Sequence, residues 1–277
     1  MIDAAVDLLT CPVCGQDLAA AGTTLRCPAG HSFDVARQGY VNLVAGGSPH
    51  AGDTAEMVAA RRRFVDGGWY LPVSDAVARA AASAPAGPVL DLGAGTGHYL
   101  AAVLDADPSG ASRTVGLALD VSVYAARRAA RCHPRAGAAV ADTWRPLPVR
   151  DGAVTAVLDV FAPRNVPEVA RVLRPGGVLV VATPGPGHLA ELRSRLGLLD
   201  VEPDKDERLA QAVSGHLEAA GEERVGARLR LPREAAVDLV AMGPSARHTG
   251  PEALAALPAD GLEVTVEVWV RRYRRQP

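Results

Sequence analysis

Three cysteines and a histidine near the N-terminus have the spacing of a metal site. Cys11, Cys14, Cys27 and His31 form the pattern C-x2-C-x12-C-x3-H, in which CPVCG and CPAGH are two short knuckles that supply two ligands each. Structural zinc is held by four thiolate or imidazole ligands. Disulfides are the alternative, but the odd third cysteine of the cluster weighs against them. The spacing therefore predicts one structural zinc ion, which stabilises a module too small to fold on its own core.

The segment 89–100, VLDLGAGTGHYL, has the composition of a cofactor-binding turn between a strand and a helix. Its alternate glycines allow the backbone to turn sharply against a bulky ligand, and the helix that follows directs free N–H groups toward it. A dinucleotide fingerprint has the spacing G-x-G-x-x-G. Here the spacing is G-x-G-x-G, and Asp91 precedes it by two residues. A carboxylate at that place would repel a phosphate, but it suits the cationic amino acid end of S-adenosylmethionine.

This spacing resembles motif I of the class I methyltransferases, and a tight structural turn in some other α/β protein is the alternative. The residues that we expect to bind the methyl donor here are Asp91, Gly93, Ala94, Gly95, Thr96, Gly97, His98 and Tyr99.

Acidic residues end the next two predicted strands. Asp120, in LALDVS, can accept hydrogen bonds from both ribose hydroxyls of the donor. Asp142, in VADTW, could contact the adenine amino group. Capping of the next helix is the alternative for Asp120, and a surface turn is the alternative for Asp142.

The elements that must position these residues alternate between strands and helices. Strands are predicted over 89–92, 114–119, 138–141, 153–161, 177–183, 225–231 and 262–270. Helices are predicted after the glycine turn, over 122–133 and near 233–241. Such alternation implies a parallel α/β sheet with right-handed crossovers. Ligands of these sheets bind beyond the carboxyl ends of the strands, where the acidic residues and the glycine turn are found.

Composition bounds the class of protein. The 277 residues are 48% hydrophobic with a net charge of −2, so a sizeable core is expected and a global basic signature for nucleic acid is absent. Local arginine clusters such as 61–63 either bind RNA backbone or are solvated helix faces. No segment is long and apolar enough for a membrane span, and the N-terminus lacks the basic region of a secretory signal. A cytoplasmic location is expected.

Three segments carry a resemblance to a known family: CPVCG, CPAGHSFDVARQGYVNLV and GDTAEMVAARRRFVDGGWY. They closely resemble the bacterial 23S rRNA guanine-N1 methyltransferases, the RlmA/TlrB family, and the resemblance covers essentially the whole chain. It implies a class I S-adenosylmethionine-dependent methyltransferase with a Rossmann-like seven-stranded sheet and a small N-terminal zinc-binding module. The expected parts are 1–45, a zinc-binding RNA-recognition module; 46–84, a linker with helices; and 85–277, the methyltransferase domain.

The fourth predicted strand ends in DVFAP, where amino-methylating relatives carry an Asn/Asp-Pro-Pro-aromatic motif. Phe161 could stack on an extruded base, and ordinary core packing is the alternative. No side chain stands out as an obligatory base. Asp159 is the candidate acceptor for the weakly acidic proton of guanine N1. Further along, Pro184 to His188 are expected to form a loop over the cleft.

The resemblance implies methyl transfer to N1 of a guanine in the hairpin 35 loop of 23S rRNA. The segment MGPSARH (242–248) resembles the Gram-positive branch, which modifies position 748 and is associated with resistance to tylosin-like macrolides. The alternatives are the same chemistry at guanine 745, a methyltransferase of small molecules, and a non-catalytic zinc-dependent RNA-binding protein. The resemblance also suggests a homodimer.

Overall fold

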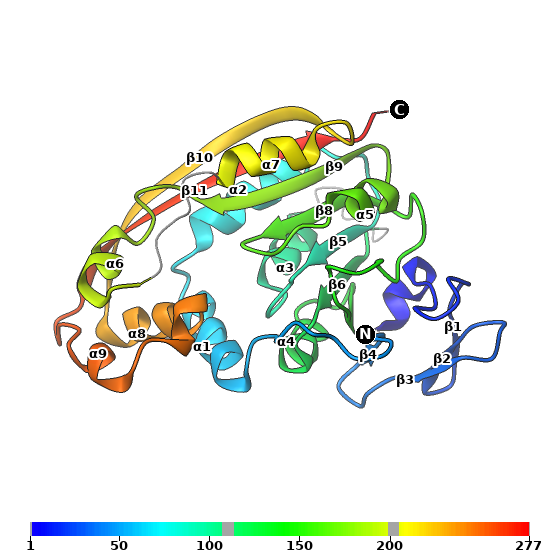
Figure 1. Ribbon diagram of the computed structural model, residues 1–277, viewed down its shortest axis with the longest axis horizontal. Helices are drawn as coiled ribbons and strands as arrows, with labels where there is room; N and C mark the ends of the chain where they lie inside the picture. Colours follow the sequence, from blue (N-terminus) through cyan, green and yellow to red (C-terminus); the bar gives the residue numbers. More distant parts are fainter. Residues whose placement is uncertain (1, 107–113, 199–204, 277) are drawn as a thin grey trace.

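The fold is organised around one mixed sheet of eight strands, in the order β10-β11-β9-β8-β5-β6-β7-β4 (Figure 1). The computed structural model describes residues 2–106, 114–198 and 205–276. The strands of this sheet are β4 (Tyr40–Asn42), β5 (Val89–Leu92), β6 (Gly116–Asp120), β7 (Ala136–Val140), β8 (Val154–Val160), β9 (Leu173–Pro184), β10 (Glu218–Leu231) and β11 (Leu262–Arg274). Neighbours from β9 to β4 are parallel, whereas β11 runs antiparallel to both β9 and β10. This confirms the predicted α/β class.

Helices cover both faces of the sheet. They are α1 (Ala55–Asp66), α2 (Leu71–Ala81), α3 (His98–Asp105), α4 (Val123–Ala129), α5 (Val166–Val172), α6 (Ala190–Leu196), α7 (Lys205–Val213), α8 (Arg233–Ala241) and α9 (Pro251–Ala255), with 3-10 helices η1 (Ile2–Leu8) and η2 (Pro244–Arg247). Successive strand residues belong to different cores: Leu117 and Leu119 pack on one side, and Ala118 on the other. The central strands are buried on both faces, which explains why their sequences are continuous apolar runs.

The eighth strand comes from the N-terminal part of the chain. Residues of the predicted zinc module form a three-stranded sheet of β1 (Ala19–Ala21), β2 (Thr24–Arg26) and β3 (Ser32–Asp34). The chain then enters the large sheet as β4, which pairs in parallel with β7 so that Tyr40 lies opposite Ala138. The seven predicted strands are therefore extended by one. Without β4, the edge of β7 would present unpaired N–H and C=O groups.

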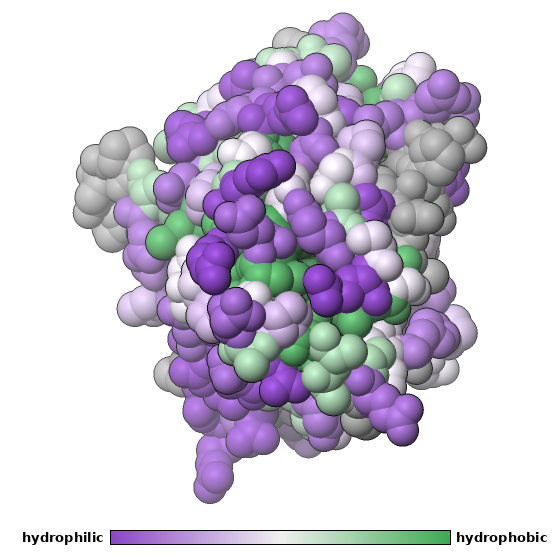
Figure 2. Space-filling view, turned by 90° about the vertical axis from the view of Figure 1, so that its left-hand side faces the viewer, coloured by the Kyte–Doolittle hydropathy of each residue, from purple (hydrophilic) through white to green (hydrophobic). Residues whose placement is uncertain are grey.

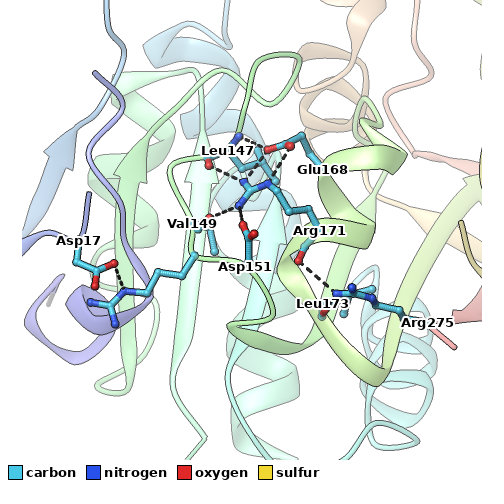
Figure 3. A network of polar contacts seen from close by, with 9 residues as sticks. Asp17, Leu147, Val149, Asp151, Glu168, Arg171, Leu173 and Arg275 are labelled. Carbon is cyan, nitrogen blue, oxygen red and sulfur yellow. Dashed lines mark hydrogen bonds and ion pairs between the residues drawn. The ribbon is translucent and has the colours of Figure 1, made fainter. Parts of the chain in front are cut away.

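A second connection fixes this N-terminal part to the loop that follows β7, and it includes an ion pair of 2.8 Å between Asp17 and Arg150 (Figure 3). The Thr10 N–H donates to the carbonyl of Pro148, and the Arg150 N–H donates to that of Leu8. The same loop is held from behind by the guanidinium of Arg171, which donates to the carbonyls of Leu147 and Val149 and pairs with Glu168 and Asp151. One arginine thus stiffens the surface on which the zinc-binding part rests.

Several of the predicted elements have different lengths in the structure. The helix predicted over 122–133 ends at Ala129. The strand predicted over 225–231 begins earlier, at Glu218, and the strand predicted over 262–270 ends later, at Arg274. The additional strand residues are mostly charged and pair across the strands: Glu222 lies opposite Arg271, and their side chains form an ion pair of 3.2 Å. None of the helices among the described residues has the length and apolarity required to span a membrane.

Candidate functional site

The four predicted zinc ligands converge. His31 Nδ1 lies 3.4 Å from Cys27 Sγ and 3.6 Å from Cys11 Sγ, and Cys14 Sγ lies 3.7 Å from Cys27 Sγ. All four ligand atoms are within 4.8 Å of one another. A tetrahedron with bonds of about 2.0–2.3 Å has edges of roughly 3.3–3.8 Å, so these donors fit a zinc ion. The knuckles lie in the turn after η1 and between β2 and β3. Four protein ligands leave no open coordination position, so the site is structural.

The glycine turn connects β5 to α3 as predicted. Gly95 has φ +55° and Gly97 has φ +77°, a left-handed conformation that side chains rarely adopt. A Cβ atom on Gly97 would lie 2.7 Å from the Cys132 sulfur, and one on Gly95 would lie 2.9 Å from Arg61 Nη1. Glycine is therefore required here for two reasons, the backbone angle and the lack of space. The fourth cysteine is explained by this packing against the turn.

A cavity of about 430 Å³ opens beside this turn. Most of the predicted donor residues of the turn line it: Asp91, Gly93, Ala94, Thr96, His98 and Tyr99. Its other walls come from α1, the N-cap residue of α2, the end of β8, the loop after β9, α6, α8 and the segment that follows α8. Figure 2 shows the side of the molecule over α1, α6 and α8, where hydrophobic residues form the floor of a hollow within a hydrophilic rim.

Asp91 carries the strongest chemical signal in this cavity. Its side chain is only 1% exposed, and among the described residues Oδ2 has no hydrogen-bond partner. Burial and the nearby carboxylates of Asp120 and Asp159 raise the pKa of Asp91 well above its usual range. A buried carboxyl group of this kind lacks a cation, and the amino group of S-adenosylmethionine would supply one. The donor therefore fits this wall of the cavity.

Asp120 lies behind the turn and supports it. One carboxylate oxygen accepts the Gly95 N–H at 2.9 Å and the other accepts the Ser122 N–H at 2.8 Å. Burial raises the pKa of Asp120, and these two hydrogen bonds oppose that rise. The side chain of Ser122, not Asp120, caps α4, because its Oγ accepts the Ala125 N–H. Asp120 does not line the cavity, so its predicted contact with the ribose stays a prediction.

The segment before α1 covers the carboxyl ends of β6 and β7. Asp142 follows β7, and its Oδ2 lies 2.7 Å from Ser48 Oγ and 2.9 Å from His50 Nδ1. Burial raises the pKa of Asp142, but these hydrogen bonds outweigh it and the net pKa is lowered. The Ser122 hydroxyl donates to the carbonyl of Asp53 at 2.6 Å. In this structure Asp142 is engaged by the linker, so its expected contact with adenine also stays a prediction.

Arg61 is a site residue that the sequence does not single out for the donor pocket. Its guanidinium donates to Asp53 Oδ2 at 2.6 Å and to the carbonyl of Met242 at 2.8 Å, directly above the glycine turn. The other two arginines of the triplet are also paired: Arg62 with Asp66, and Arg63 with Asp238 through two guanidinium nitrogens. Contact of this triplet with RNA stays a prediction: Arg61 and Arg63 connect α1 to neighbouring segments, whereas Arg62 pairs within the helix.

Three aromatic rings form the far wall of the cavity. Phe161, just after β8, has φ +54° and is 39% exposed. Its ring stacks on that of His188 with centroids 5.9 Å apart, and Tyr70 lies 6.2 Å from Phe161. His188 is the last residue of the segment that we expected to form a loop over the cleft. The two ends of that segment, Pro184 and His188, both line the cavity. An exposed ring held in a strained backbone fits the predicted stacking on a base.

Asp159 has different surroundings from those expected of a proton acceptor. Its side chain is buried, and Oδ1 lies 3.3 Å from Arg164 Nε. The cavity lining does not include it.

The segment MGPSARH, in contrast, reaches the cavity through Met242, Gly243, Pro244 and Ser245. Tyr70 is the second residue that sequence reasoning missed. It follows the glycine pair after α1 and ends the family-like segment GDTAEMVAARRRFVDGGWY, but nothing in that segment assigns it to the cavity.

Comparison with known proteins agrees with both parts of this description. Residues 9–45 match a family model described as RlmA, N-terminal, a zinc ribbon, and residues 90–181 match one described as a methyltransferase domain. A Streptomyces fradiae protein named 23S rRNA (guanine(748)-N(1))-methyltransferase is 50% identical over 270 residues, which cover 95% of each chain. A Micromonospora griseorubida protein assigned as a 23S rRNA (guanine-N(1)-)-methyltransferase is 54% identical over 96% of this chain and 97% of its own.

Solved structures show the same fold at low sequence identity. A chain from a complex of a methyltransferase and its activator from Haloferax volcanii has a TM-score of 0.53 at 15% identity, covering 82% of this chain and 100% of its own. A methyltransferase structure from Bacillus halodurans has a TM-score of 0.50 at 14% identity, covering 74% of this chain and 99% of its own.

Proposed function

The chain belongs to the 23S rRNA (guanine-N1)-methyltransferase family, and from that membership we propose that it methylates N1 of guanine 748 of 23S rRNA. The observation that carries the choice of guanine is the near full-length 50% identity to the Streptomyces fradiae protein whose name specifies position 748. The placement of Met242 to Ser245 in the cavity wall supports it, because this segment can contact the substrate.

Different residues of the chain would bind the methyl donor and the target base. S-adenosylmethionine, when bound, supplies a methyl group on a cationic sulfur. Asp91 would hold its amino group, and the glycine turn allows the backbone to approach it closely. Asp120 fixes the turn and would accept the ribose hydroxyls. Phe161 would stack on the base, so that N1 is held in line with the methyl group.

The substrate would be the hairpin 35 loop, where a single-stranded base can be turned out and read on its Watson–Crick edge. A methyl group on N1 removes a hydrogen-bond donor and adds bulk to the wall of the peptide exit tunnel. We infer that this modification hinders tylosin-like macrolides and that the enzyme acts in the cytoplasm, where ribosomes are assembled. Guanine 745 of the same loop is the alternative target.

Primer extension tests this proposal directly. A protein-free 23S rRNA transcript is incubated with the enzyme and labelled S-adenosylmethionine, and reverse transcription should stop at position 748 because methylated N1 blocks pairing. A transcript with adenine at 748 serves as the control. A stop at 745 would contradict the choice of guanine, and no stop anywhere in the hairpin would contradict the proposed function. Incorporation of label elsewhere would favour another substrate.

The other readings predict different results. A non-catalytic RNA-binding protein would not bind S-adenosylmethionine, yet Asp91, the glycine turn and the cavity are all intact. A methyltransferase of small molecules has no need of the zinc-binding part. Label from S-adenosylmethionine should enter a small acceptor without RNA if that interpretation is right, and should enter only RNA if ours is right.

A further inference from the structure

A chain of hydrogen bonds ends at a hydroxyl group in the cavity wall. The backbone N–H of Glu267, on β11, donates to His188 Nδ1 at 3.2 Å. His188 Nε2 lies 3.4 Å from the Tyr70 hydroxyl. Tyr70 stands at the N-cap of α2 and His188 in the loop after β9, so three separate elements meet here. Both side chains are more than nine-tenths buried, and both line the cavity.

The geometry decides which way these hydrogen bonds point. A nitrogen that accepts a backbone N–H carries no proton, so neutral His188 must carry its single proton on Nε2. Nε2–H then donates to the Tyr70 oxygen, and the hydroxyl proton of Tyr70 is directed elsewhere. Among the described residues no acceptor for that proton is found. Burial and the nearby Arg193 lower the pKa of His188 to about 4, so it stays neutral at physiological pH.

The hydroxyl therefore offers a fixed donor to a ligand next to the stacking ring. Phe161 lies 6.2 Å from the Tyr70 ring and 5.9 Å from His188, centroid to centroid. A base stacked on Phe161 would present its polar edge to this wall. Burial also raises the pKa of Tyr70, so the hydroxyl keeps its proton and can only donate to an incoming carbonyl.

We propose that the Tyr70 hydroxyl donates a hydrogen bond to O6 of the target guanine, and that His188 is the positioning residue that orients it. This rests on the proposed function. As the N1–methyl bond forms, the methyl–sulfur bond breaks and its electron pair stays on sulfur, while the N1 proton leaves to water. The negative charge of deprotonated guanine is shared between N1 and O6, so a donor at O6 stabilises it. A buried tyrosine that stabilises an enolate-like oxygen in this way is a known catalytic device.

Tyr70→Phe removes the hydroxyl alone and is the first test. Single-turnover methylation of the transcript should slow about 10- to 100-fold, the value of a hydrogen bond to a charged group. The affinity for S-adenosylmethionine, measured by calorimetry, should be unchanged, and the pH–rate profile should move to higher pH. Tyr273→Phe, at a buried tyrosine on β11 that does not line the cavity, is the matched control and should stay within about twofold of wild type. A several-fold weaker donor affinity in Tyr70→Phe would instead assign the hydroxyl to the donor and overturn the proposal.

A substrate change locates the bond on O6. With 6-thioguanosine at the target position, sulfur accepts poorly, so wild type and Tyr70→Phe should differ by about threefold or less. An undiminished difference would overturn the contact with O6. His188→Gln, which can place an N–H where Nε2–H lies, should retain most activity, whereas His188→Ala should match Tyr70→Phe in rate and pH profile. If wild type fails to methylate the transcript at all, the proposed function fails, and this inference falls with it.

Discussion

At the scale of single residues, two acidic side chains of the proposed donor site have different surroundings. Asp120 accepts from Gly95 and Ser122 at once, which ties the glycine turn to the start of α4. Asp91 instead has a buried oxygen that finds no partner in the described part of the chain, so a cation beside it would be stabilising. Asp120 thus holds the shape of the turn, and we propose that Asp91 supplies the charge that binds the donor.

Replacing Asp120 should therefore weaken donor binding. An amide at this position has one acceptor oxygen, and its NH2 group would face the N–H of Gly95 or Ser122. We expect Asp120→Asn to weaken the affinity for S-adenosylmethionine by about 10- to 100-fold in calorimetry. Asp105→Asn, on an exposed side chain at the end of α3, is the control and should bind normally. Normal affinity in Asp120→Asn would place the ribose elsewhere.

The glycine turn can be tested with two substitutions that impose the same strain. Gly95 and Gly152 both have φ +55°, but an added Cβ meets Arg61 only at Gly95, whereas nothing lies within 4 Å at Gly152. Both alanine variants should lose about 1 kcal/mol of unfolding free energy to backbone strain. Only Gly95→Ala should also lose donor affinity. Equal donor affinities in the two variants would show that crowding above the turn does not matter.

Residues within a short motif were predictable, and residues assembled over long distances were not. The zinc ligands and the glycine turn each lie within 21 residues or fewer, so spacing alone revealed them. Arg61 reaches the site through Asp53 and the distant Met242, and Tyr70 through His188. Such contacts arise from the packing of α1 against α8 and α4 and of α2 against the sheet, and no local pattern encodes them.

At the scale of elements, helix α5 fixes the conformation of the loop after β7. Arg171 on α5 holds this loop through backbone carbonyls and through Glu168, whose Oε2 also accepts the Leu147 N–H at 2.7 Å. Burial raises the pKa of Glu168, but its bonds with Arg171 and Leu147 outweigh that effect and lower the net pKa.

The lowered pKa of Glu168 predicts a pH-dependent contribution to stability. The contribution is fully present above the unfolded-state pKa of about 4.3 and is lost as the pH falls through the lower folded-state pKa. Glu168→Gln should therefore cost about 1–2 kcal/mol of unfolding free energy at pH 7 and progressively less toward pH 3. Urea unfolding at both pH values checks this. A difference that does not shrink in acid would mean that the charge of Glu168 is irrelevant.

The zinc-binding part is an element of the large core as well as a separate small sheet. Cys11, Leu18 and Leu25 belong to the same buried cluster as Leu117 of β6 and Val157 of β8. Loss of the metal should therefore be felt in the large sheet.

Removing one zinc ligand tests this coupling. Cys14→Ser should abolish stoichiometric zinc in elemental analysis, lower the melting temperature of the whole chain and eliminate RNA methylation. Val13→Ala, an exposed residue between the first two ligands, is the control and should retain zinc. An unchanged melting temperature in Cys14→Ser would show that the two parts unfold independently.

Strand length was the least predictable property at this scale. The hydrophobic pattern gave the buried centres of β10 and β11, but their ends are held by cross-strand pairs such as Glu222 with Arg271. A charged residue in a sequence indicates a surface, whether that surface is a loop or a strand, so pattern alone stops too early.

At the scale of the whole molecule, a net charge of −2 means that attraction to RNA must be local. The arginines of α1 are neutralised by aspartates, whereas Arg127, Arg128 and Arg131, on and just after α4, are exposed. None of the ion pairs found within the described ranges involves these three. They are the groups best able to release counterions from RNA.

Salt dependence distinguishes the two arginine sets. The logarithm of RNA affinity should fall linearly with the logarithm of salt concentration, and Arg128→Gln should reduce the slope by about 0.7–0.9. Arg62→Gln, which removes an arginine already paired with Asp66, should change it less. Equal changes in filter-binding titrations would show that RNA does not prefer the α4 surface.

The pairing of β4 with β7 sets an order of events during synthesis of the chain. The strand of Tyr40 can pair only after Ala138, about 100 residues further along the chain, has been synthesised. The metal ligands, in contrast, are all translated by residue 31 and can close around zinc while the rest of the chain is still on the ribosome. Joining them to the sheet is a late step with a high loop-closure cost. Zinc starvation should therefore act mainly on newly made chains, which would emerge without a folded N-terminus.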